Sequence, residues 1–148
     1  IPEAVAAFTD QDRERLMQDA GIVRNKRKID AAIANARAVI ALRSALAAES
    51  NAHGAGRMEE APLAQLLRPR QPYPRHLGEL VWLYQPSHQP RPKNAGEVPA
   101  QTEESRALSA ELKRRGFVFV GPVTALALMS AIGIVNTDIL GTWKRPLN

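Results

Sequence analysis

The amino-acid sequence predicts an all-α fold, a compact bundle of about five or six helices in a single domain over residues 1–148. Apolar residues recur at helical spacing over residues 29–40, and two pairs of helix start and stop signals follow each other over residues 102–136. No credible pair of strands is present, because glycines bound the short β-like run at residues 117–120 too closely. With 148 residues, of which 45% are hydrophobic, the chain can bury one modest core.

Composition limits the class of partner and of site. The chain has no cysteine, which excludes disulfides and thiolate metal sites, and its net charge of +5 favours a polyanionic partner while also being compatible with ordinary solubility. No apolar run approaches the ~20 residues that cross a bilayer, and the first residues do not resemble a signal peptide. These features predict a cytoplasmic protein that makes no membrane contact.

The first part of the chain predicts two helices. Thr9 and Asp12 have the spacing of a capping box, and we expect the helix that they open to end at Gly21. A second, amphipathic helix should follow, with an alanine-rich filling and one face directed at the core. That face is formed by Ile29, Ile33, Ala36 and Ile40.

A basic segment connects these two helices. Arg24 and Lys26 belong to a run of four cations that contains no acidic residue. One interpretation is a solvated helix entrance, since exposed cations need no partner. The other is a second anchor for a phosphate backbone.

The middle of the chain should be mostly loop. Residues 44–76 show little periodicity and several prolines, and we expect an inserted surface loop there. Residues 77–84 interrupt this region as a short helix, with Trp82 and Tyr84 expected to be partly buried in the core.

Residues 102–136 predict two helices joined by a tight turn, a helix-hairpin-helix. Thr102 is a suitable N-cap, and Gly116 stands where a left-handed C-terminal cap ends the first helix. Gly121 and Pro122 signal the second helix start, and Gly133 should end that helix.

The turn can be interpreted as a DNA-binding element. Glycines let a backbone approach a phosphate closely, and unpaired N–H groups at a helix start can donate to its oxygens. An alternative interpretation is a helix packing corner with a solvated basic end. The DNA-binding residues predicted on the first interpretation are Lys113, Arg114, Arg115, Gly116, Phe117, Val118, Phe119, Val120 and Gly121, with Arg24 and Lys26 as the second anchor.

Several blocks of the sequence resemble the DNA-3-methyladenine glycosylase I family of the helix-hairpin-helix superfamily. The blocks are LKRRGFVFVGPVTALALMSAIGIVN in the hairpin region, DAGIVRNKRKIDAAIANARAVIAL at residues 19–42, VWLY at residues 81–84 and EVPAQTEESRALS at residues 97–109. The resemblance implies a base-excision repair hydrolase that flips an alkylated nucleotide out of double-stranded DNA and cleaves its N-glycosidic bond.

The chain departs from the family pattern in two ways. The family's base-binding carboxylate and most pocket aromatic residues belong to an N-terminal segment that nothing in this sequence matches. The family's zinc-binding His and Cys correspond here to Asp138 and Thr142, so we expect no metal and no cofactor. Asp138 is the only catalytic candidate, because the wider superfamily places an aspartate after the second helix; a helix cap is its other interpretation.

Three hypotheses about function therefore remain. The first is a 3-methyladenine glycosylase acting as a monomer, of which this chain alone should not excise bases efficiently. The second is a non-catalytic DNA-binding module that keeps the hairpin. The third is a helical protein-interaction domain whose basic residues are incidental.

Overall fold

A computed structural model describes residues 1–54, 63–67, 71–142 and 144. Its elements are helices α1 (Pro2–Ala6), α2 (Asp10–Gln18), α3 (Lys26–Gly54), α4 (Leu77–Trp82), α5 (Glu103–Arg114) and α6 (Pro122–Ala131), with 3-10 turns at Ala64–Leu66 and Ala95–Glu97. The described residues contain no strand, so the predicted all-α class is confirmed.

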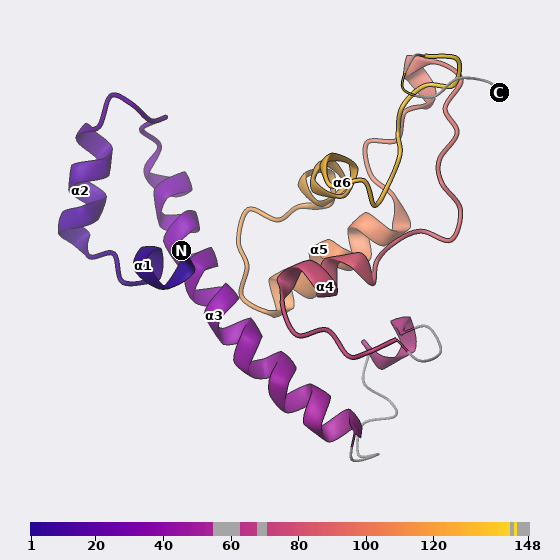
Figure 1. Cartoon of the computed structure of the whole chain (residues 1–148). Helices are drawn as coiled ribbons and strands as arrows, with labels where there is room; N and C mark the ends of the chain where they lie inside the picture. Colours follow the sequence, from indigo (N-terminus) through magenta and orange to yellow (C-terminus); the bar gives the residue numbers. More distant parts are fainter. Residues whose placement is uncertain (55–62, 68–70, 143, 145–148) are drawn as a thin grey trace.

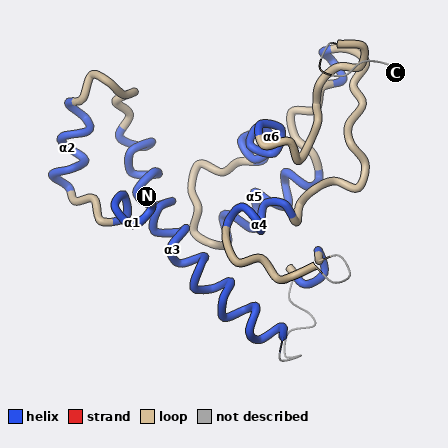
Figure 2. Tube along the Cα trace, viewed as in Figure 1, coloured by secondary structure: helices blue, strands red, loops and turns tan. Residues whose placement is uncertain are grey.

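Helix α3 separates the other helices into two groups, one on each of its sides. It runs diagonally through Figure 1, with α1 and α2 packed beside its first half and α4, α5 and α6 on the other side. Figure 2 shows that long loops connect α4 to α5 and follow α6. These two loops meet where the backbone N–H of Leu140 donates to the carbonyl of Pro92 at 2.8 Å.

Helix α3 is longer than the sequence indicated. The expected surface loop over residues 44–76 is wrong for residues 44–54, which continue the helix to Gly54. The physical reason is an alanine-rich stretch with high helix propensity, in which Leu46 follows Leu42 and Ala38 on one buried face. Tyr73 is also buried. Residues 55–62 and 68–70 of the expected loop lie outside the described residues.

By length and composition alone, α3 would also pass as a membrane-spanning helix. A long apolar helix in the centre of a protein core meets the same criterion. In this chain, α3 buries Ile33, Leu42 and Leu46 almost completely against other helices.

One core cluster joins the second half of α3 to α4, α5 and α6. The fully buried side chains at its centre include Leu46, Leu80, Leu108, Met129 and Ile134. Of the predicted stripe on α3, Ile29, Ile33 and Ala36 are buried and Ile40 is half-buried.

The predicted ends of α5 and α6 are confirmed. Thr102 forms a capping box, in which its hydroxyl accepts from the amide of Ser105. Both helices end in a Schellman motif: Gly116 and Gly133 have φ of 86° and 82°, values that favour glycine. The amides of Phe117 and Ile134 donate to the carbonyls of the residues five positions earlier, Leu112 and Met129.

One local prediction is wrong. Helix α2 opens with the expected capping box but ends at Gln18, because Asp19 turns into an extended conformation, and Gly21 does not cap it. At the end of α4, Trp82 is partly buried as expected, with 46% of its surface exposed, and Tyr84, which follows the helix, is more deeply buried, with 7% exposed.

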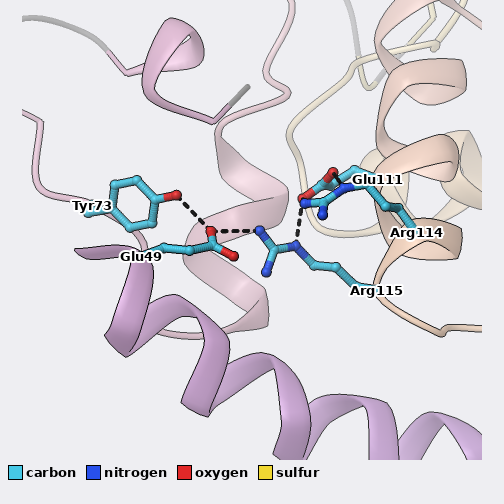
Figure 3. Close-up of polar contacts among 5 residues, drawn as sticks. All are labelled: Glu49, Tyr73, Glu111, Arg114 and Arg115. Atoms are coloured by element: carbon cyan, nitrogen blue, oxygen red, sulfur yellow. Dashed lines mark hydrogen bonds and ion pairs between the residues drawn. The ribbon is translucent and has the colours of Figure 1, made fainter. Parts of the chain in front are cut away.

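An internal ion-pair network fastens the end of α5 to α3 (Figure 3). The Arg115 guanidinium donates from Nη2 to Glu49 of α3 at 2.9 Å and from Nε to Glu111 of α5. Glu49 also accepts from the Tyr73 hydroxyl at 2.7 Å, and Glu111 accepts from Nε of Arg114 at 2.8 Å. The side chain of Arg115 is only 5% exposed and that of Glu111 only 7%.

The network sets the ionisation of its members. Burial raises the pKa of Glu111, but hydrogen bonds and charge from the two arginines outweigh it, so the pKa lies below its usual value. The pKa of Glu49 is lowered in the same way, by Arg115 and Tyr73 against burial. Burial and the neighbouring Glu49 carboxylate raise the pKa of Tyr73. Because both carboxylate pKa values are lowered on folding, their stabilising contribution is present at neutral pH and is lost as the pH falls through the lowered values.

Replacing Arg115 with methionine should lower the free energy of unfolding by about 3 kcal/mol, because the change leaves buried carboxylates without their partner. The exposed neighbour Lys113 provides the control, since Lys113→Met should change the free energy of unfolding by less than about 0.5 kcal/mol. Urea unfolding followed by circular dichroism measures both. Equal effects of the two substitutions would show that the network does not stabilise the fold.

Candidate nucleic-acid interface

The hairpin, defined here as residues 116–121, projects its middle residues into solvent. Phe117 is only 6% exposed and packs in the core cluster, which fixes the start of the hairpin. Val118 is 41% exposed and Phe119 is 60% exposed, so the tip is open to a partner. The hairpin therefore has a buried base and an accessible tip.

Two side chains from neighbouring helices hold the hairpin backbone. Asn35 of α3 donates from Nδ2 to the carbonyl of Val118 at 3.1 Å and accepts from the amide of Val118 at 2.8 Å. The buried Ser109 hydroxyl of α5 donates to the carbonyl of Val120. Figure 1 shows the connection between α5 and α6 passing beside α3, where Asn35 reaches it.

Phe119 has a left-handed backbone conformation, with φ of 59°. This conformation costs a residue with a Cβ on the order of 1–2 kcal/mol. Net contributions of ~1 kcal/mol from each of the two Asn35 hydrogen bonds are of similar size, so they can offset the strain. A strained residue with a largely exposed aromatic ring is a typical feature of a binding site.

The hairpin and the start of α6 present a group of unpaired amides. Helix α6 begins at Pro122 with Gly121 as N-cap, and no side chain caps it. Within the described ranges, no acceptor pairs with the backbone N–H groups of Phe119, Val120, Gly121, Val123 and Thr124. Because the positive end of the α6 dipole lies at the same place, this surface can bind an anion through its main chain.

The three predicted cations at the end of α5 have different environments. Lys113 is exposed beside the hairpin. Arg114 is 57% exposed, although its guanidinium is paired with Glu111. Arg115 is buried in the network of Figure 3, so the prediction that it contacts DNA is wrong. A basic residue at a helix end can turn inward when a buried carboxylate meets it, and sequence spacing cannot distinguish the two cases.

The second predicted anchor lies where α2 and α3 meet. Arg24 and Lys26 are both exposed, but Lys26 lines a hollow that it shares with Asp10, Glu14 and Asp30. These carboxylates weaken its attraction for phosphate. In addition, no described contact joins Arg24 or Lys26 to the hairpin. Their DNA-binding role stays a prediction.

One residue of α3 that contacts the hairpin, Asn35, was missed from the sequence. Its only signal was an amide in an alanine-rich helix, where such a side chain has lower helix propensity. Lys28, one of the four cations of the second predicted anchor, is exposed and lies seven residues before Asn35, which places it on the same helix face, ~10 Å along the axis.

Asp138 lies in a separate polar hollow after α6. Ser130, Thr137 and Lys144 line the same hollow, which has a volume of about 420 Å³, and Asp138 is half-buried. Its backbone N–H donates to the side chain of Asn136 at 2.9 Å. Thr142, at the other position that corresponds to a zinc ligand, donates its hydroxyl to the carbonyl of Ile139 at 2.8 Å.

A second hollow adjoins the hairpin and is almost entirely apolar. Its volume is about 440 Å³, and side chains of α1, α3, α4, α5 and α6 line it together with Phe117 and Val120. Asn35 is the polar side chain among its lining residues. The surface against which the base of the hairpin packs is therefore hydrophobic. The unpaired backbone N–H groups lie at the hairpin tip and the start of α6.

Comparisons with known proteins agree on one family. The methyladenine glycosylase family model matches residues 1–53 and 59–145. DNA-3-methyladenine glycosylase 1 of Escherichia coli is 36% identical over 150 residues, which cover 99% of this chain and 65% of the relative. The Haemophilus influenzae DNA-3-methyladenine glycosylase is 28% identical over 141 residues, which cover 93% of this chain and 60% of the relative.

Solved structures give the same result. A crystal structure of 3-methyladenine DNA glycosylase I superposes with a TM-score of 0.70 at 30% identity, covering 98% of this chain and 65% of that one. The chain thus spans less than two thirds of the length of the curated relatives that it matches. The matching sequence blocks, the helical fold and the hairpin lead to one conclusion. The chain belongs to the methyladenine glycosylase family.

Proposed function

We propose that this chain is the hairpin-bearing part of a DNA-3-methyladenine glycosylase, a base-excision repair hydrolase that acts on alkylated double-stranded DNA. The family supports the reaction, and the observation that carries the role of this chain is the group of unpaired amides at the exposed hairpin. We further propose that it acts in the cytoplasm as a monomer.

The hairpin binds the sugar-phosphate backbone. A phosphate oxygen beside Gly121 can accept from main-chain N–H groups and lie in the positive field of the α6 N-terminus. Lys113 adds a charge next to it. Contacts of this kind hold the duplex in register and do not read bases, which suits an enzyme that searches many sequences.

The proposed reaction hydrolyses the N-glycosidic bond of a flipped 3-methyladenine. Methylation at N3 leaves the base cationic, so it departs readily with the bonding electrons while water adds to the sugar. The enzyme's main task is then to recognise a flipped cationic base, for which a carboxylate and stacked aromatic rings are suited. In this chain, Asp138 is the candidate for assisting the water, and the base-binding carboxylate is expected from the part of the relatives that this chain does not span.

Release of free 3-methyladenine from methylated duplex DNA tests the proposal. Any longer natural form should release the base, and this chain should bind the same DNA while releasing the base much more slowly. A longer form that binds DNA but releases no base would favour the non-catalytic DNA-binding module.

Salt dependence tests the phosphate contact. For each phosphate contact that is lost with a cation, the slope of log affinity against log salt should change by about 0.9, so Lys113→Ala should reduce the slope by about that amount. The exposed Lys93, on the α4–α5 connection, gives the control Lys93→Ala, whose slope should equal that of the unmodified chain. Fluorescence anisotropy of a labelled duplex provides the measurement. A salt-independent affinity in the unmodified chain would instead support the protein-interaction hypothesis.

A side chain at Gly121 should obstruct the phosphate without disturbing the fold. No atom lies within 4 Å of the position that a Cβ at Gly121 would take, and its φ is −69°, which any residue can adopt. Gly121→Val should therefore weaken duplex binding by about tenfold, equivalent to about 1.4 kcal/mol. Gly116→Val should weaken it at least as much, because φ of 86° strains the substituted residue.

Arg43→Ala is the control for the glycine substitutions, since Arg43 is a half-exposed cation of α3 that is paired with Glu3 of α1. Its loss should change duplex affinity by less than about twofold. Equal binding by all three variants would contradict the role of the hairpin.

A further inference from the structure

We propose that Asn35 is a positioning residue, which sets the hairpin in the conformation that presents its amides to DNA. The inference rests on the proposed function, because it assigns a cause to the shape of the proposed DNA-binding surface. Asn35 lies on α3, 83 positions away from Val118 in the sequence, so no local signal in the hairpin encodes the contact.

The contact pairs both backbone polar groups of Val118, its N–H and its carbonyl, with one side chain. The Asn35 side-chain amide donates to the carbonyl of Val118 and accepts from its N–H, at 3.1 and 2.8 Å. A carboxamide has one donor and one acceptor side, so it can satisfy both groups at once and fix the backbone direction at Val118. Neither a carboxylate nor a hydrocarbon of similar shape can do this.

The fixed residue is the one that precedes the strained residue. Phe117 is anchored in the core before the clamp, and Phe119 adopts φ of 59° directly after it. Once the direction at Val118 is lost, a more relaxed conformation of Phe119 becomes available, and the unpaired amides that follow it change their positions. Asn35 therefore acts on the surface through Val118 without having to touch the DNA.

Helix α3 is a suitable reference for this clamp. The same helix carries Glu49, which holds Arg115 at the end of α5. Both ends of the segment from Arg115 to Val118 are thus fixed to one rigid helix, and the hairpin follows the position of α3.

A second side-chain amide donates and accepts at the same time at another site. Gln89 donates to the carbonyl of Ile134 at 3.0 Å and accepts from the amide of Asn136 at 2.8 Å, in the segment after α6. It uses the same carboxamide chemistry as the Asn35 clamp, but on two residues of a segment other than the hairpin. Gln89→Ala is accordingly a matched control for the loss of an amide clamp.

The test compares Asn35→Ala and Asn35→Asp with Gln89→Ala in the full chain. Asn35→Asp keeps the shape of the side chain and can accept from Val118, but its ionised carboxylate cannot donate to the Val118 carbonyl. Both Asn35 variants should bind a duplex at least tenfold more weakly, with an unchanged salt slope because no cation is lost. Gln89→Ala should bind within about twofold of the unmodified chain.

Hydrogen exchange supplies the readout that a purely stabilising role would not change. In both Asn35 variants, the Val118 amide should exchange faster while the core amides of α5 and α6 keep their protection. In Gln89→Ala, the change should occur at Asn136 instead.

The possible outcomes separate this inference from the proposed function. If the unmodified chain fails to bind duplex DNA, the proposed function is wrong and this inference fails with it. If the unmodified chain binds and both Asn35 variants bind equally well, only the inference fails. If both Asn35 variants lose their helical circular dichroism, Asn35 is needed for folding and the positioning role is overturned.

Discussion

The buried guanidinium of Arg115 is the interaction on which the arrangement of this molecule depends. It joins Glu49 near the end of α3 to Glu111 on α5 through two ion pairs. A charge in this position must be paired, because desolvation makes an unpaired one costly. The requirement fixes the C-terminal end of α5 and, with it, the origin of the hairpin.

From that origin, the hairpin combines tight anchoring with exposed hydrogen-bond donors. The core fixes Phe117, and Ser109 holds the carbonyl of Val120. These contacts leave the N–H groups of Phe119, Val120 and Gly121 unpaired in the part of the chain that the structure describes, which gives the surface a donor character that its apolar side chains would not indicate. Hence the binding capacity belongs to the backbone and depends on residues that do not themselves reach the surface.

The sequence predicted the parts of this fold that local rules determine. Caps and left-handed glycines depend on a few neighbouring residues, so Thr102, Gly116 and Gly133 were predicted correctly. Long-range pairing was not predictable in this way: the direction of Arg115 depends on Glu49, and the role of Asn35 depends on a turn far along the chain. For the same reason the end of α3 was placed too early, because Leu46 and Glu49 gain their packing and ionic partners only in the folded chain.

The two tyrosines of the chain make the ion-pair network optically visible. Tyr73 donates directly to Glu49, and burial together with the charge of Glu111 raises the pKa of Tyr84 to about 12. At a pH between the ordinary tyrosine pKa of about 10 and these raised values, both phenols thus stay protonated while the helices remain packed, and the ultraviolet signal of phenolate appears in this pH range when the helices separate. The chain carries a natural spectroscopic probe at the junction of α3 and α5, with no need for a label.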